Sequence, residues 1–113
     1  MRIFIVELGT GVDLHGRNAT GAAVKAVKNA FNHVSLPGLR AVVGLSDLSG
    51  VQIEVRLGVP DGLEPVDTSQ VAAQFPFGRA EVVVERGGLL APGGGADPND
   101  LIVMVNAAIY VRV

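Results

Sequence analysis

An aspartate and a histidine lie two residues apart in a glycine-rich segment, Gly9-Thr-Gly-Val-Asp-Leu-His-Gly16. In extended backbone, side chains at i and i+2 project to the same side, so Asp13 and His15 would lie together. Two chemistries suit such a pair. One is general acid–base catalysis, in which Asp13 orients the His15 imidazole and raises its basicity. The other is divalent metal binding, completed by Glu7, His33 or a group from a neighbouring subunit.

Glycines shape the rest of this candidate site, because they allow conformations and close approaches that side chains block. Four residues of the segment are expected to bind a ligand: Gly9, Thr10, Gly11 and Gly16. Leu14 stands where a dinucleotide fingerprint needs its third glycine, which argues against nucleotide binding. A structural role is the alternative, in which Asp13 caps a turn and His15 bonds to backbone.

The composition limits the class of protein. The chain has 113 residues, which predicts a single domain over 1–113. No apolar run approaches the roughly 20 residues that cross a bilayer, and Met1-Arg2-Ile3 shows no cleavable signal, so no membrane partner is expected. The net charge of −2 and nine unclustered Lys and Arg argue against nucleic acid. The absence of cysteine fits a cytoplasmic location.

The chain is unusually apolar for its size. Apolar residues make up 49% of it, charged residues 18%, and the mean hydropathy is +0.43. Since no segment is long enough to enter a membrane, the excess apolar surface is expected to lie in a subunit interface. The sequence therefore predicts a homo-oligomer, and we expect a trimer.

Hydrophobic periodicity predicts alternating strands and helices. The expected elements are a strand at 2–8, a helix from Asn18 or Thr20 to about Val34, a strand at 51–59, a short helix from Asp67 or Thr68 through Gln74, and strands at 79–86 and 101–113. Residues 9–16 and the glycine-rich 87–99 are expected to be loops. Residues 39–50 stay open, with a short strand or helical turn at Arg40–Gly44. The order predicts an α+β, two-layer sandwich with a four-stranded mixed sheet and two helices on one face.

The sheet face opposite the helices is expected to be half polar. The charged residues that alternate with aliphatic ones on the strands are Glu54, Arg56, Glu81, Glu85 and Arg112. Such a face suits neither a dry core nor a plain solvent surface. We therefore interpret it as a candidate oligomer interface.

The segment Glu7-Leu-Gly-Thr-Gly-Val-Asp-Leu-His-Gly16 resembles the N-terminal G-x-G-x-D-x-H-G motif of a family of short bacterial and plant proteins described as conserved hypothetical. The resemblance extends over the whole chain, through Ser-Leu-Pro-Gly at 35–38, Gly-Val-Pro at 58–60 and Gly-Gly at 87–88. It implies a shared fold and carries no established function.

Two more distant resemblances supply hypotheses about chemistry. Val51-Gln-Ile-Glu-Val55 and Glu85-Arg-Gly-Gly88 resemble parts of one repeat unit of the ring-opening amidohydrolases, cyanuric acid hydrolase and barbiturase. This implies a threefold assembly; Arg86 stands where those enzymes have a serine. The segment 9–15 is similar to that of the trimeric cyclodiphosphate synthase of isoprenoid synthesis, which implies zinc at Asp13 and His15.

Two classes of function follow. The first is a small-molecule-binding protein or enzyme, hydrolase-like in the amidohydrolase interpretation, with its site at residues 9–16 near a subunit boundary. Its catalytic residues would be Asp13 and His15, with a divalent metal as the candidate cofactor. The alternative is a non-catalytic oligomeric scaffold or accessory subunit.

Overall fold

A computed structural model describes residues 2–32, 50–76 and 78–113 of the chain. Its elements, in order, are β1 (Ile3–Asp13), α1 (Ala19–Phe31), β2 (Gln52–Val59), α3 (Thr68–Ala72), β3 (Arg79–Arg86), β4 (Leu89–Pro92) and β5 (Leu101–Arg112). The predictions for His33, for the helix end near Val34 and for residues 39–49 lie outside the described residues. Among the described residues, no helix is long and apolar enough to cross a membrane.

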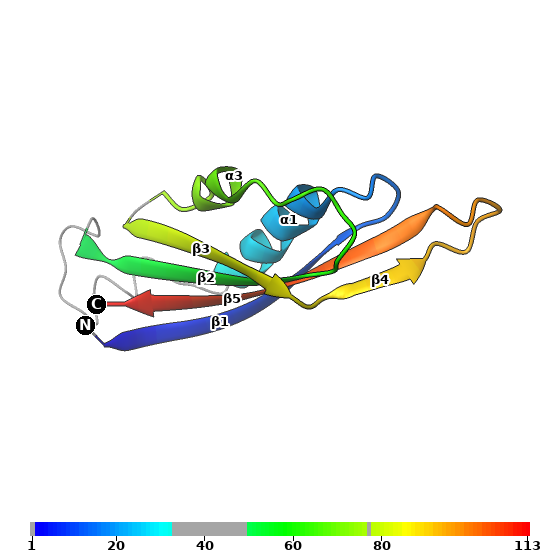
Figure 1. The fold of residues 1–113 in the computed structure, drawn as a ribbon. Coiled ribbons are helices and arrows are strands. Elements are labelled where there is room, and N and C mark those ends of the chain that lie inside the picture. The colour runs from blue at the N-terminus through cyan, green and yellow to red at the C-terminus, as the bar shows by residue number, and fades with distance from the viewer. Residues whose placement is uncertain (1, 33–49, 77) are drawn as a thin grey trace.

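The strands form one mixed sheet in the order β1-β5-β2-β3, with β4 pairing to the far part of β5. Among the strands that the structure describes, β2 and β3 run parallel and the other pairs are antiparallel. Helix α1 lies against β1 and β5, and α3 lies against β3 and α1, on one side of the sheet (Figure 1). The α+β class is confirmed. Within the described residues the sheet has five strands rather than four, because Leu89–Pro92 pair with β5 inside the predicted loop.

Sequence signals for the helix starts are confirmed. The Asn18 side chain caps α1 by accepting a hydrogen bond from Gly21 N at 2.9 Å. Asp67 caps α3, where its Oδ1 accepts from Gln70 N at 3.2 Å and from the Ser69 hydroxyl at 2.6 Å. Those bonds favour the ionised carboxylate and lower the pKa of Asp67. The short helix ends at Ala72, two residues before the predicted Gln74.

Strand alternation predicts the core correctly. One side of β2 and β5 is buried on the helix side of the sheet, together with Val51 just before β2: Ile53, Val55, Leu57, Val59, Val103, Val105, Ala107, Ile109 and Val111. The helix contributes small residues to this core: Ala19, Ala22, Ala23, Ala26, Val27 and Ala30. Small side chains on α1 let its backbone approach the sheet closely.

That close approach explains the first two glycines of the candidate site. Strand β1 continues to Asp13, so Gly9 and Gly11 lie in a strand rather than in the predicted loop. A Cβ on Gly11 would overlap the carbonyl oxygen of Ala22, and one on Gly9 would overlap that of Ala26. The glycines therefore serve as the surface on which α1 packs.

The same helix covers part of the outer edge of β1. Asn29 Oδ1 accepts a hydrogen bond from Thr10 N at 3.1 Å, and Lys25 Nζ donates to Val12 O at 3.1 Å. Lys25 and Asn29 are four residues apart and lie on one side of α1. They satisfy backbone groups at a sheet edge that would otherwise invite another strand.

Glycines also allow the chain to pass from β3 to β4. Strand β3 lies beside β2, whereas β4 lies beside β5, so the chain steps inward past the end of β2. Gly88 has a φ of 66°, and a Cβ on Gly87 would lie 2.9 Å from the Gly58 Cα. The β4–β5 ribbon then extends from the body of the sheet, and the molecule measures 55 × 20 × 19 Å (Figure 1).

We expect Gly11→Ala to lower the free energy of unfolding by about 1–3 kcal/mol, because its Cβ must push α1 away from β1. Gly50→Ala is the matched control, since a Cβ there meets nothing within 4 Å. Urea denaturation of both variants measures the difference. Equal stability of the two variants would contradict the packing role of Gly11.

Candidate functional site

Asp13 closes the turn between β1 and α1. Its Oδ2 accepts hydrogen bonds from Gly16 N at 2.9 Å and from Asn18 N at 3.0 Å. The side chain is half-buried at the end of β1. A carboxylate at this point satisfies two backbone donors just before the helix begins. This geometry matches the structural alternative for Asp13.

His15 is paired with a residue from the other end of the chain. Its Nδ1 lies 3.1 Å from Asp100 Oδ1, and the exposed fractions of the two side chains are 77% and 25%. Because β1 ends at Asp13, the i and i+2 rule for extended backbone does not apply to Asp13 and His15. The contact instead connects the β1–α1 turn to the residue that precedes β5.

A surface hollow of about 310 Å³ is lined by Gly16, Arg17, Gly62, Leu63 and Glu64. Arg17 adopts a φ of 51°, the one positive value at a non-glycine residue in the described part of the chain. Gly9 and Gly11 lie instead in β1 under α1, and Thr10 between them lies on the side of the sheet away from α1. The structure thus divides the predicted ligand residues between a packed strand and an open turn.

The described residues hold no group of three or more His, Cys, Asp or Glu side chains that could share a metal ion. Asp13 and His15 each have a partner within the chain, and those partners differ. Their catalytic and metal-binding roles therefore stay predictions.

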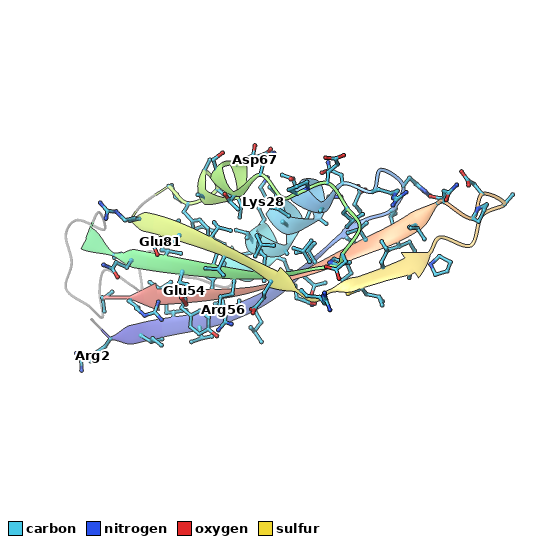
Figure 2. All side chains as sticks on the ribbon, viewed as in Figure 1. Arg2, Lys28, Glu54, Arg56, Asp67 and Glu81 are labelled. Carbon is cyan, nitrogen blue, oxygen red and sulfur yellow. The ribbon has the colours of Figure 1, made fainter. Side chains whose placement is uncertain are left out.

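The side of the sheet away from the helices forms a second candidate site, which we call the open sheet face. Glu54 and Arg56 project from this side in Figure 2. Its large exposed apolar side chains, with their exposed fractions, are Val6 (49%), Leu8 (69%), Val83 (47%) and Leu89 (54%). No helix of the described residues covers them.

Ion pairs run across the open sheet face. Arg56 binds Glu85 through Nε at 3.2 Å and Nη2 at 3.1 Å, a two-point contact that raises the pKa of Arg56 through hydrogen bonding and charge. Arg112 lies 3.6 Å from Glu54, with its guanidinium carbon 5.8 Å from the centroid of the Tyr110 ring.

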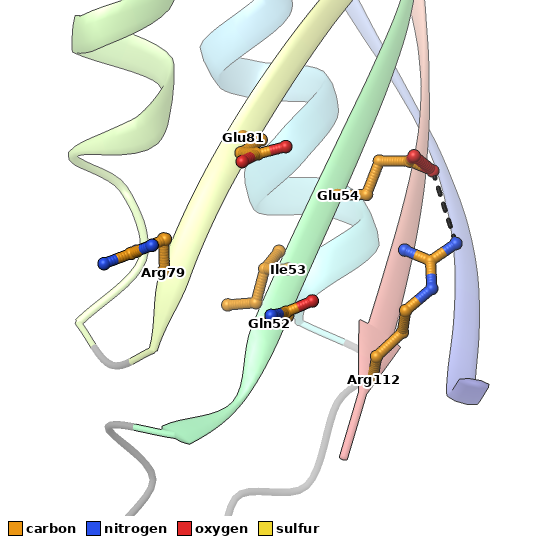
Figure 3. A pocket seen from close by; sticks show the side chains of 6 residues that line it. All are labelled: Gln52, Ile53, Glu54, Arg79, Glu81 and Arg112. Carbon is orange, nitrogen blue, oxygen red and sulfur yellow. Dashed lines mark ion pairs between the residues drawn. The ribbon is translucent and has the colours of Figure 1, made fainter. Parts of the chain in front are cut away.

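Two hollows mark this face. One of about 100 Å³ is lined by Gln52, Ile53, Glu54, Arg79, Glu81 and Arg112 (Figure 3). Another, of about 260 Å³, includes Leu8, Arg56, Asn106 and Tyr110 in its lining. Sequence reasoning found the charged residues of this face by their alternation. It missed Arg79, whose place beside Gln52 depends on the register of β2 and β3.

Replacing Asp13 tests its part in the turn. Asp13→Ala removes the acceptor for two backbone N–H groups, so we expect it to lower the free energy of unfolding by about 1–2 kcal/mol. Asp13→Asn retains an acceptor oxygen and should lose less. Urea denaturation compares the two, and an unaltered stability of Asp13→Ala would contradict the capping role.

Comparisons with known proteins place the chain in a family. The family model described as "Conserved hypothetical protein (Lin0512_fam)" matches residues 3–111. A solved structure of an FtsZ-like protein of unknown function from Nostoc punctiforme PCC 73102 is similar, with 40% identity and a TM-score of 0.85 over 97% of this chain and 93% of that one. The search of curated proteins gives no match. The chain belongs to the conserved hypothetical family Lin0512_fam.

Proposed function

We propose that this protein is a homo-oligomeric subunit that assembles through its open sheet face, in a scaffold or accessory role. The observation that carries the proposal is the pair of exposed apolar side chains Val6 and Leu8 on a sheet face without a helix over it. Single exposed apolar residues are common on monomers, whereas a contiguous apolar strip beside polar groups is typical of an interaction surface.

The neighbours of Leu8 extend this strip. On the open sheet face, Leu8 lies beside Ala108. Beyond the polar pair Thr10 and Asn106, Val12 lies beside Met104, which in turn pairs with Leu89 of β4. Methionine, tyrosine and arginine are enriched in interface centres, and Met104, Tyr110 and Arg56 all occur on this face. The apolar side chains and the ion pairs together give the proposed interface an apolar part and a polar part.

The charged side chains of the open sheet face can also be covered by a second copy. Arg112 and Glu54 have side chains only 29% and 33% exposed before any partner is added. Arg56 and Glu85 neutralise each other through two hydrogen bonds, which reduces the cost of removing them from water. Pre-formed ion pairs of this kind can enter an interface without leaving an isolated charge.

A small-molecule site near Gly16 is a second candidate function. The hollow beside Gly16 is lined by one basic and one acidic residue, Arg17 and Glu64. The positive φ of Arg17 supports a functional role for this hollow, since strained backbone is often found at functional sites. A ligand there would lie close to His15. In such a site His15 would act on the ligand as the sequence predicts, whereas Asp13 would only stabilise the turn.

Leu8→Arg should convert the protein to a monomer. It places one charge per copy in the apolar strip, and we expect the dissociation constant to rise by about 100-fold or more, because an unpaired charge in an apolar contact costs several kcal/mol. Sedimentation equilibrium of the wild type and the variant measures the mass and the constant. The wild-type mass also distinguishes a trimer from a dimer.

Leu14→Arg is the control for this variant. Leu14 is 55% exposed but lies in the turn after β1, away from the open sheet face. We expect it to leave association unchanged. A monomeric wild type, or equal weakening by both substitutions, would overturn the proposal.

His15→Ala tests the second candidate. The pair with Asp100 is largely exposed on the His15 side, so its loss should cost about 1 kcal/mol or less and lower the melting temperature by only a few degrees. If a metal is bound through His15, a chelator lowers the melting temperature of the wild type and not of the variant. A chelator-insensitive wild type beside a strongly destabilised variant would favour the structural role.

A further inference from the structure

The strand registers arrange the open sheet face into four rows that run across the strands. The first row contains Arg112, Gln52 and Arg79, and the second Val6, Tyr110, Glu54 and Glu81. The third contains Leu8, Ala108, Arg56 and Val83, and the fourth Thr10, Asn106, Gly58 and Glu85. The charged side chains are therefore basic in the first and third rows, and acidic in the second and fourth.

We infer that two copies associate face to face about a two-fold axis that crosses the strands between the second and third rows. Such an axis reverses the strand direction of the second copy. The first row then faces the fourth, and the second faces the third. Every basic row meets an acidic row. This inference rests on the proposed assembly through the open sheet face, and it adds the symmetry and the register.

Individual residues are complementary in the same arrangement. Because this axis retains the order of strands, Arg79 faces Glu85 of the second copy, and Arg56 faces Glu54 of the second copy. Arg79 and Glu81 have no ion pair with another described residue in the single chain, so Arg79 is available for such a contact. Gln52 faces Gly58 of the second copy, where the missing side chain leaves room.

The apolar strip obeys the same symmetry. Val6 belongs to the second row and Leu8 to the third, so each lies opposite the other across the axis. These two side chains, 49% and 69% exposed, would cover each other twice in the dimer. One axis therefore places Arg56 and Arg79 opposite carboxylates and Val6 opposite Leu8, while Glu81 faces Val83 and Arg112 faces Asn106.

Other symmetries pair fewer opposite charges and apolar side chains between the copies. A two-fold axis parallel to the strands would place each row opposite the same row of the second copy. Basic side chains would then meet basic ones and acidic would meet acidic, which is unfavourable. A ring of three copies places different parts of the face against each other and does not pair Val6 with Leu8 of a neighbour on both sides. The row pattern thus favours a dimer over the trimer expected from the sequence.

The area is sufficient for a specific contact. Four strands about 4.8 Å apart and four rows about 6.8 Å apart give a footprint of about 500 Å² on each copy. The two copies together bury about 1,000 Å², near the lower limit for a specific interface. Aligned packing of two sheets at about 30° suits such a contact.

Single cysteines on β3 test the symmetry, because the chain has no cysteine of its own. With facing sheets about 10 Å apart, the two Val83 Cα atoms would be about 12 Å apart and the two Arg79 Cα atoms about 23 Å apart. A short bifunctional thiol reagent should therefore give at least about tenfold more cross-linked dimer for Val83→Cys than for Arg79→Cys. Both positions are exposed on the same edge strand, so each controls for the other.

A charge reversal provides a second measurement that needs no cross-link. Arg79→Glu places a carboxylate opposite Glu85 of the second copy at two symmetric points, so we expect the dissociation constant to rise at least about tenfold. Lys28→Glu makes the same charge change on exposed α1 and should leave it unchanged. Circular dichroism of each variant verifies its fold.

The outcomes separate this inference from the proposed assembly. A monomeric wild type would overturn both. A trimeric mass, equal cross-linking of the two cysteine variants, or an Arg79→Glu variant that associates as tightly as Lys28→Glu would overturn the two-fold register alone. A dimer with the expected cross-linking and charge effects supports it.

Discussion

The backbone contact between α1 and β1 is the constraint on which the rest of the fold depends. Gly9 and Gly11 leave no room for a Cβ, and the facing helix residues include Ala22 and Ala26. Helix and strand approach each other at glycine and alanine because no larger side chains separate them. The helix is thereby fixed over β1 and β5, and Lys25 can reach the edge of β1.

Fixing α1 on one side leaves the other side of the sheet without a helix. A single amphipathic layer buries the aliphatic row of β2 and β5, but the alternate residues of those strands must project the other way. Those residues include Glu54 and Arg56 of β2 and Tyr110 of β5, and Leu8 of β1 lies on the same side. A small domain with this division leaves apolar side chains such as Leu8 exposed, and the proposed self-association would remove them from water.

Local pattern predicted much of the fold and less of the site. The alternation in β2 and β5 and the caps at Asn18 and Asp67 depend on near neighbours, so they could be read from the sequence. The glycines at 9 and 11 were assigned to a loop because conformational freedom does not show whether a glycine serves a turn or a close contact. Asp100 could not be found as the partner of His15, since 85 residues separate them.

The charge rows show why register carries information that composition lacks. Along any one strand, the charges look like ordinary alternation, as Arg79 and Glu81 do on β3. Across strands, the pairing of Gln52 with both Arg79 and Arg112 brings two cations into one row, and the pairing of Glu54 with Glu81 brings two anions into the next. Glu54 and Glu81 are direct cross-strand neighbours, and such like-charge pairs are unfavourable in an isolated sheet, whereas Gln52 separates the two arginines. Within the chain, Arg112–Glu54 and Arg56–Glu85 already join neighbouring rows of opposite charge. A second sheet with the opposite row above each one would extend this pairing and would give Arg79 a carboxylate partner.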